Sequence, residues 1–305
     1  MFNFIKNENL KKIGQILGKL LMVVSVFFII QKMMDFQVDI KKVFERQNIL
    51  ILFFLCIMQT TLIFLVCSVW LRYLQVSINQ KLPFKNTILV YTKANLYKYI
   101  PGNVLQYVGR NEVAIRENIE HKKVFFATVL DVGTMVFVKF LFSLLTLQEK
   151  ILSVLEEYFA MSNLLIILSV GVTIATICAF FVLKKYIKNY IFSFFKGVFS
   201  YLLNDIVAAA IYLIVVIFVL EYKCDIKMIM FLAGGYTLGS AIGFLTPGVP
   251  GGIGVREAVI MFLASGLCDM EIVVTAVVLT RIICVLADVL AYLFATVLTK
   301  KELIT

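Results

Sequence analysis

Long runs without a charged residue decide what this chain can fold into. Residues 49–71 and 163–183 each contain no Asp, Glu, Lys or Arg, and about 20 helical residues cross the roughly 30 Å hydrocarbon layer of a membrane. An average soluble domain carries about 25% charged residues, whereas this chain of 305 residues carries 16% and is 61% hydrophobic. The sequence therefore predicts an integral membrane protein of the all-α, polytopic class.

The uncharged runs and the breaker residues between them predict the number of spans. Each run is long enough for one helical crossing, so about six transmembrane helices are expected. They lie near residues 13–34, 49–71, 124–147, 163–183, 197–220 and 272–299.

Two further apolar stretches, residues 84–119 and 228–266, are interrupted. In the second, residues 234–254 hold eight of the sixteen glycines. Because proline and glycine end helices, each stretch is predicted to form two half-helices that meet in a re-entrant hairpin. The breakers in question are Pro101, Gly102, Pro247, Gly248, Pro250, Gly251, Gly252 and Gly254.

The basic residues predict the orientation. If the N-terminus is cytoplasmic, 19 of the 29 Lys and Arg residues fall on the cytoplasmic side, as the positive-inside rule requires. The first 20 residues carry four lysines and no small-residue cleavage site, so we expect no cleavable signal peptide. The expected location is the cell membrane, with both termini cytoplasmic.

The two interrupted stretches resemble each other. A shift of 146 residues places Pro101 on Pro247 and Arg110 on Arg256. Three spans separate corresponding elements, so the two copies should run in opposite directions, as in the inverted repeats of many transporters. We therefore predict one membrane domain over residues 1–305, with repeats near 49–147 and 197–299. Chance similarity is the alternative.

Other composition features exclude several function classes. The formal charge of +10 comes from lysines and arginines in short segments between spans, where topology explains them, so no nucleic-acid partner is expected. The six cysteines are scattered without a CxxC pair, and there is one histidine, His121. Neither a metal site nor a cofactor is therefore predicted.

Two motifs resemble a known family. Residues 250–257 read Pro-Gly-Gly-Ile-Gly-Val-Arg-Glu, and residues 98–110 contain Lys-Tyr-Ile-Pro-Gly followed by Gly-Arg. These strings resemble the lysylphosphatidylglycerol synthase transmembrane region, the flippase-like family, in its stand-alone version often associated with polysaccharide systems. The resemblance implies movement of a phospholipid or glycolipid from the inner to the outer leaflet, with two re-entrant hairpins meeting near mid-membrane. Because larger members continue into a soluble aminoacyltransferase domain and this chain stops at Thr305, synthesis of lysyl-lipid is not expected.

Arg110 and Arg256 are the main candidate substrate-binding residues. A charge in an apolar arm costs at least about 2.5–3.5 kcal/mol on insertion scales, so each needs a partner or a watery cavity. A planar guanidinium matches phosphate oxygens in a two-point contact, which favours receipt of a lipid phosphate by each arginine. The alternative is a set of static ion pairs, Arg110 with Glu112 or Asp131 and Arg256 with Glu257 or Asp288.

The interrupted segments and the charges within spans supply the remaining candidates. The prolines and glycines named above could bring backbone amides and a helix N-terminus to an anionic headgroup, or could simply allow tight helix packing. Charges within spans usually mark a pathway or a proton relay, although interior salt bridges would explain them equally. These inward-pointing residues are Asp131, Lys139, Asp205, Arg281 and Asp288.

The predicted function is that of a lipid flippase or transporter. An anionic phospholipid or a polyprenyl-phosphate-linked sugar would enter a polar cleft between the hairpins while its tails stay in the bilayer. The alternatives are a membrane-embedded enzyme acting on lipid-linked substrates and a scaffold that partners lipid- or polysaccharide-synthesis proteins. A homo-oligomer is left open.

Overall fold

The computed structural model describes residues 45–99, 105–148, 190–246, 252, 254–264 and 267–300. Every secondary-structure element in these ranges is a helix, which confirms the all-α prediction for this part of the chain. The elements are α3 (Arg46–Ile78), α4 (Phe84–Leu96), η2 (Tyr97–Tyr99), α5 (Leu105–Arg110), α6 (Glu112–Arg116), α7 (His121–Thr146), α10 (Ile191–Ile214), η3 (Val215–Val219), α11 (Ile226–Leu245), α12 (Val255–Ala264) and α13 (Met270–Lys300).

Five of the described helices are long and apolar enough to cross a membrane. Four of them, α3, α7, α10 with η3, and α13, coincide with spans predicted near 49–71, 124–147, 197–220 and 272–299. The chain is therefore a membrane protein. The predicted spans 13–34 and 163–183 lie outside the described residues.

The fifth apolar helix, α11, falls within a stretch that the sequence predicts to be a hairpin. It is one continuous helix of 20 residues despite its glycines. These glycines serve packing instead of ending the helix: a Cβ at Gly239 would lie 2.9 Å from the backbone oxygen of Arg256 in α12. Small residues let helix backbones approach closely within a membrane. The interruption comes later, between Leu245 and Val255.

Local hydrogen bonds explain where several helices begin and end. The Asp225 side chain accepts a bond from the backbone N–H of Met228 at 2.8 Å and caps the N-terminus of α11. Helix α3 ends at Asn79, which adopts the left-handed conformation with φ of 54°. At the start of α12, the Gly254 N–H donates to Glu257 Oε2 at 2.7 Å, the reach-back contact of a capping box.

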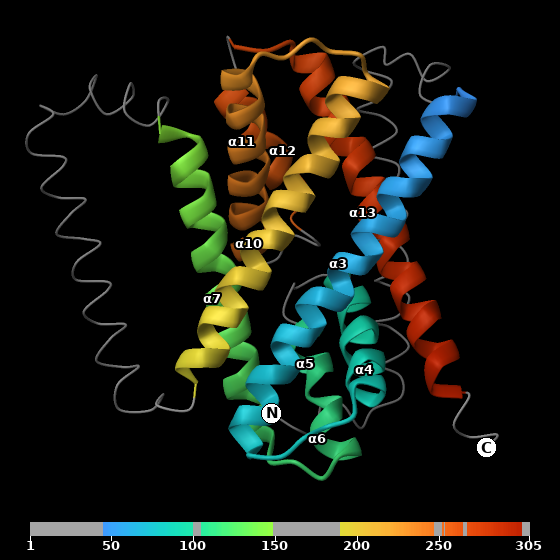
Figure 1. Cartoon of the computed structure of the whole chain (residues 1–305), viewed down its shortest axis with the longest axis vertical. Helices are drawn as coiled ribbons and strands as arrows, with labels where there is room; N and C mark the ends of the chain where they lie inside the picture. Colours follow the sequence, from blue (N-terminus) through green and yellow to red (C-terminus); the bar gives the residue numbers. More distant parts are fainter. Residues whose placement is uncertain are drawn as a thin grey trace, which may run out of the picture.

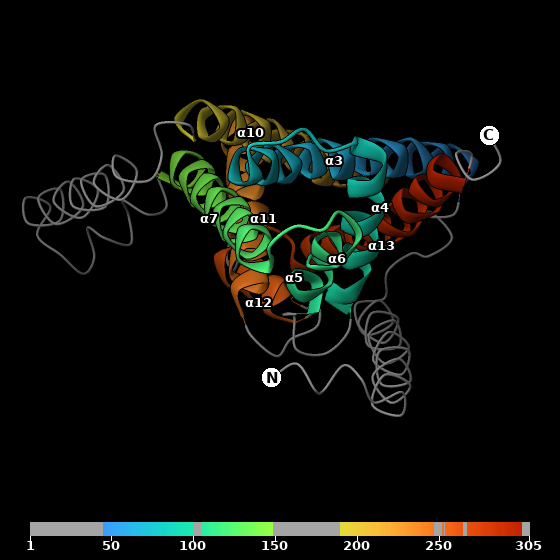
Figure 2. The same ribbon diagram turned by 90° about the horizontal axis from the view of Figure 1, so that it is seen from below.

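The two interrupted segments lie at opposite ends of the helix bundle. Helices α4, α5 and α6 occupy the lower end in Figure 1, whereas α11 and α12 occupy the upper end. Viewed from below, α3 and α10 lie along one side, α7, α11 and α12 along a second, and α4 and α13 along a third (Figure 2). These elements enclose a central space into which side chains from all of them project.

Two hydrogen bonds between side chains hold α3 against α7. Trp70 donates its indole N–H to Thr128 Oγ1 at 3.0 Å, and the Tyr73 hydroxyl lies 2.9 Å from Thr134 Oγ1. All four side chains are buried, so the bonds satisfy polar atoms that would otherwise be costly in an apolar core.

The outer helix faces carry large exposed apolar side chains, as a lipid-facing surface requires. Examples are Phe53, Phe125, Phe192 and Phe199.

Candidate functional site

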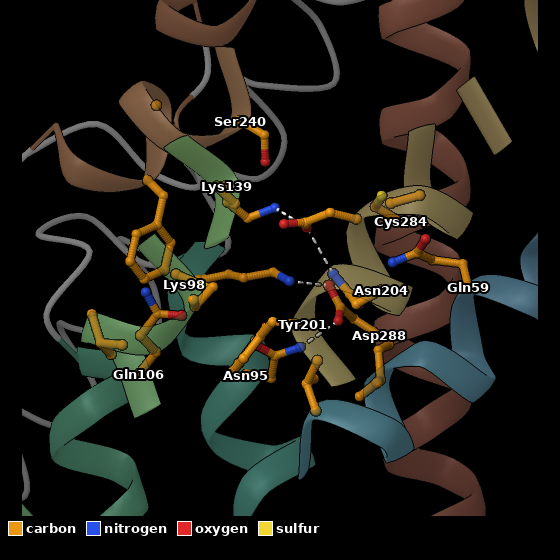
Figure 3. A pocket seen from close by; sticks show the side chains of 18 of the residues that line it. Gln59, Asn95, Lys98, Gln106, Lys139, Tyr201, Asn204, Ser240, Cys284 and Asp288 are labelled. Carbon is orange, nitrogen blue, oxygen red and sulfur yellow. Dashed lines mark hydrogen bonds and ion pairs between the residues drawn. The ribbon is translucent and has the colours of Figure 1, made fainter. Parts of the chain in front are cut away.

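A cavity of about 220 Å³ lies where the two interrupted segments meet α3, α7, α10 and α13. Figure 3 shows Lys98, Lys139 and Asp288 projecting into it from different helices. Both candidate arginines line this one cavity, although 146 residues separate them in the chain. The charged side chains in its wall are Lys98, Arg110, Asp131, Lys139, Asp205, Arg256, Arg281 and Asp288.

Arg110 is held on every side. Its guanidinium donates to Asp131 Oδ2 at 2.6 Å and lies 4.4 Å from the centre of the Tyr91 ring, with Trp70 at 5.5 Å and Tyr107 at 5.7 Å. Cation–π contacts of this kind are strongest where water is excluded. Of the two ion pairs considered for Arg110, the structure has the one with Asp131.

Both carboxylate oxygens of Asp131 accept hydrogen bonds. Its Oδ1 accepts a hydrogen bond from the Tyr201 hydroxyl at 2.6 Å, so both carboxylate oxygens have donors. With an exposed fraction of 1%, this carboxylate is among the most deeply buried charges in the described residues.

Glu112 lies outside the cavity wall. It accepts hydrogen bonds from Lys93 at 2.9 Å and from Arg116 at 2.7 Å, in a partly exposed cluster next to α4. Burial raises the pKa of Glu112, but the hydrogen bonds from Lys93 and Arg116 outweigh burial, and the net pKa lies below its ordinary value. The role that this geometry supports for Glu112 is to tie α6 to α4.

Arg256 is held differently from Arg110. It donates to Ser240 Oγ at 2.7 Å and lies 5.2 Å from the centre of the Tyr236 ring. Neither ion pair considered for it, with Glu257 or with Asp288, is present. Among the residues that the structure describes, Arg256 is in no ion pair.

Glu257 pairs with Arg281 instead of with its neighbour. Its Oε1 accepts from Arg281 at 2.8 Å, while its Oε2 caps α12 through the Gly254 N–H. Because position N3 of a helix points back along the axis, Glu257 is directed toward the helix start and away from Arg256.

The other two ion pairs among the described residues of the cavity wall also join different elements. Asp288 in α13 accepts from Lys98 at 2.6 Å, and Asn95 and Tyr99 also donate to it. Lys139 in α7 donates to Asp205 in α10 at 2.7 Å. All five charges within the predicted spans line the cavity.

Among the described residues, the cavity wall contains five cations and three carboxylates, an excess of two positive charges. Glu257 behind the wall neutralises a fourth cation, Arg281, which leaves an excess of one. Arg256 is the cation left over. An uncompensated charge is costly in a low-dielectric interior, so this position favours an anionic ligand.

Two of the predicted glycines lie in the described residues and have a conformational role. Gly252 and Gly254 have φ of 71° and 82°, the left-handed region that favours glycine. A Cβ on Gly252 would also lie 2.8 Å from the backbone of Gly243 in α11, whereas one on Gly254 would meet no atom within 4 Å. The predicted residues outside the described ranges are Pro101, Gly102, Pro247, Gly248, Pro250 and Gly251.

This pair of glycines gives a matched test of the turn. Gly254→Ala should lower the free energy of unfolding by about 1–2 kcal/mol, the cost of a left-handed non-glycine residue. Gly252→Ala should cost more, because the new methyl group also meets the backbone of Gly243. Thermal unfolding of the detergent-solubilised variants, followed by circular dichroism, measures the difference. Equal losses would show that the approach to α11 is not tight.

Several cavity residues were not among the sequence candidates. Lys98 is one of the basic residues that the positive-inside rule assigns to the cytoplasmic side, yet it reaches Asp288 in the cavity. Gln59 and Asn204 lie within apolar spans, and an uncharged amide in a span is a signal that could have identified both. Asn95 lies in α4 and Ser240 in α11, where nothing in the sequence separates them from ordinary packing residues.

These features define an all-helical membrane protein with a buried, positively biased cavity. Comparison with protein-family models, with curated proteins and with solved structures finds no match for this chain. Among the described residues, no group of three or more His, Cys, Asp or Glu side chains could hold a metal ion.

Proposed function

We propose that this protein moves a lipid with an anionic phosphodiester headgroup between the leaflets of the cell membrane. The observation that carries the proposal is Arg256, a partly buried cation in no ion pair with a described residue, in the wall of the shared cavity. A phosphate oxygen pair fits its guanidinium fork, and the low-dielectric surroundings strengthen the contact. The acyl or prenyl tails would stay in the bilayer.

The arrangement of the interrupted segments supports an inverted repeat with two re-entrant hairpins. The segments approach the cavity from opposite ends of the bundle, and each contributes an arginine to it (Figure 1). Helices α4 and α12 have 13 and 10 residues, or about 20 and 15 Å at 1.5 Å per residue, too short to cross the bilayer alone. Alternating access would then come from movement of one half against the other.

The distribution of basic residues supports both termini being cytoplasmic. In the described residues the end of the bundle that holds α4, α5 and α6 also carries Lys81, Lys85, Arg116, Lys122 and Lys123. The positive-inside rule assigns such an end to the cytoplasm. On this proposal the chain belongs to the flippase-like family that its two motifs resemble.

Reconstitution into liposomes tests the proposed function. Phosphatidylglycerol with a fluorescent headgroup-proximal label is placed in both leaflets, and dithionite then reduces only the outer-leaflet label. Vesicles with the protein should lose the inner-leaflet signal as well, whereas protein-free vesicles should retain it. A short prenyl phosphoglucose carrying the same label forms a second arm, since it shares the phosphodiester.

Three outcomes separate the classes of function. Exchange at the protein-free rate for both lipids would contradict a transporter and favour a scaffold. Conversion of the labelled lipid to a new product on thin-layer chromatography would favour a membrane enzyme. Accelerated exchange without a new product supports the flippase proposal.

A further inference from the structure

Asp205 in α10 has one carboxylate oxygen that accepts no hydrogen bond from the described part of the chain. Its Oδ1 accepts hydrogen bonds from Lys139 at 2.7 Å and from Asn204 at 3.1 Å. Its Oδ2 is buried and has no hydrogen-bond donor among the described residues, although the exposed fraction of the side chain is 0%. A buried acceptor without a donor loses its hydration and gains nothing in return.

The other carboxylates in and behind the cavity wall use both oxygens. Each has one donor or more on either oxygen, and each is anchored by a basic side chain from another element. The sets are Arg110 and Tyr201 on Asp131, Asn95, Tyr99 and Lys98 on Asp288, and Arg281 and the Gly254 N–H on Glu257. In the described part of the cavity, Asp205 is thus the carboxylate that can still accept a hydrogen bond, through Oδ2.

Asp205 and Arg256 share the cavity but attract opposite parts of a ligand. Arg256 offers donors to a phosphate, whereas Asp205 repels a phosphate and offers an acceptor to a donor group. A headgroup that satisfied both would have a phosphodiester at one end and a hydroxyl or an ammonium at the other. Lys139 and Asn204, which hold Asp205 Oδ1, leave Oδ2 as the acceptor for that group.

The charge balance decides between a hydroxyl and an ammonium. With Glu257 included, the described part of the cavity has five cations and four carboxylates, an excess of one positive charge. A phosphodiester with a hydroxylated headgroup carries one negative charge and neutralises this excess. A zwitterionic headgroup with an amine would leave it in place, and a phosphomonoester with two charges would reverse it.

We infer that the cavity selects a hydroxylated phosphodiester, with the phosphate at Arg256 and a headgroup hydroxyl donating to Asp205 Oδ2. This inference rests on the proposed function and names its substrate class. Neutral amides in the wall, from Gln59 and Asn95, add hydrogen-bonding groups suited to further hydroxyls. Phosphatidylglycerol and a prenyl phosphohexose share the required chemistry.

A matched set of soluble lipids tests the inference without any mutation. Dihexanoyl phosphatidylglycerol and dihexanoyl phosphatidylpropanol have the same charge and similar size, but only the first has headgroup hydroxyls. Binding to the protein in phosphatidylcholine nanodiscs is measured by calorimetry. Phosphatidylglycerol should bind about 10- to 100-fold more tightly than phosphatidylpropanol, because phosphatidylpropanol has no hydroxyl to donate and leaves Asp205 Oδ2 without a hydrogen bond. Dihexanoyl phosphatidylethanolamine should bind more weakly than the hydroxylated lipid.

An Asp205→Asn variant locates the selectivity. Loss of the carboxylate should reduce the ratio of the two affinities to about 1- to 3-fold. The ratio is the readout, because a Lys139 left without its carboxylate should tighten the binding of both anions. Asp225→Asn, at the N-cap of α11 and outside the cavity, is the matched control and should keep the wild-type ratio.

The outcomes distinguish this inference from the proposed function. If neither anionic lipid binds, and a short prenyl phosphoglucose also fails to bind, the proposed function is wrong and the inference with it. If both lipids bind with equal affinity to the wild type, or if phosphatidylethanolamine binds best, the anion site stands and the selection of a hydroxyl is wrong. Preference for prenyl phosphoglucose over phosphatidylglycerol would support the inference and identify the source of the phosphodiester as a lipid-linked sugar.

Discussion

Replacement of Arg256 by alanine is expected to reduce the exchange of labelled phosphodiester lipid by at least about 30-fold while leaving the protein folded. Removing one partner of a buried, charge-assisted contact costs about 2–5 kcal/mol. The fold should tolerate the change because the one hydrogen-bond partner of Arg256 in the described residues is a neutral hydroxyl, that of Ser240. The liposome exchange assay measures the rate, and thermal unfolding in detergent checks the fold.

Two further variants interpret the result for Arg256. Arg256→Lys keeps the charge but loses the two-point fork, so its exchange rate should lie between those of the wild type and the alanine variant. Arg46→Ala is the control: Arg46 is exposed at the start of α3 and does not line the cavity, so its removal should leave the exchange rate unchanged. Wild-type exchange by Arg256→Ala would remove the basis of the proposed mechanism.

Asp131→Ala should have the largest effect on stability, a loss of about 3–5 kcal/mol in the free energy of unfolding. The substitution leaves the Arg110 guanidinium buried among Trp70, Tyr91 and Tyr107 without its carboxylate. It also removes the acceptor of the Tyr201 hydroxyl. The midpoint of thermal unfolding in detergent is the measurement, with the yield of monodisperse protein as a second readout.

A double variant separates the ion pair from the rest of the packing. Arg110→Met with Asp131→Leu removes both charges and should recover most of the lost stability, as apolar replacements of buried pairs often do. Glu112→Ala removes a carboxylate from the partly exposed cluster near α4 and should cost less than about 1 kcal/mol. If Asp131→Ala unfolds at the wild-type midpoint, the pair is not the anchor that its geometry indicates.

Together these variants test whether the two arginines have different roles. Their similar positions after a Pro-Gly pair suggested that each receives a phosphate. Arg110, however, already has a carboxylate and three aromatic neighbours, while Arg256 has a hydroxyl and one ring. We therefore expect substitution of Arg110 to act through folding and substitution of Arg256 to act through binding.

The long helices could be predicted from the sequence because membrane insertion depends on local composition. Residues 49–71 and 272–299 are predominantly apolar, and α3 and α13 form there. The glycines of residues 234–243 belong to a stretch that is predicted to be interrupted, yet α11 runs through them and ends at Leu245, before the predicted breakers at 247–254. The sequence alone does not distinguish a glycine that ends a helix from one that allows a neighbouring helix to pack closely, because the second role depends on which helix lies beside it.

The choice of ionic partners shows most clearly what depends on the tertiary structure. The sequence alone established that this is a helical membrane protein with inward-pointing charges, because transfer of apolar and charged groups out of water is decided residue by residue. It could not establish that Glu257 holds Arg281, that Lys98 holds Asp288, or that Arg256 keeps its charge free of a described carboxylate. Coulomb energies depend on distances between atoms of different helices, and only the packing of those helices sets such distances.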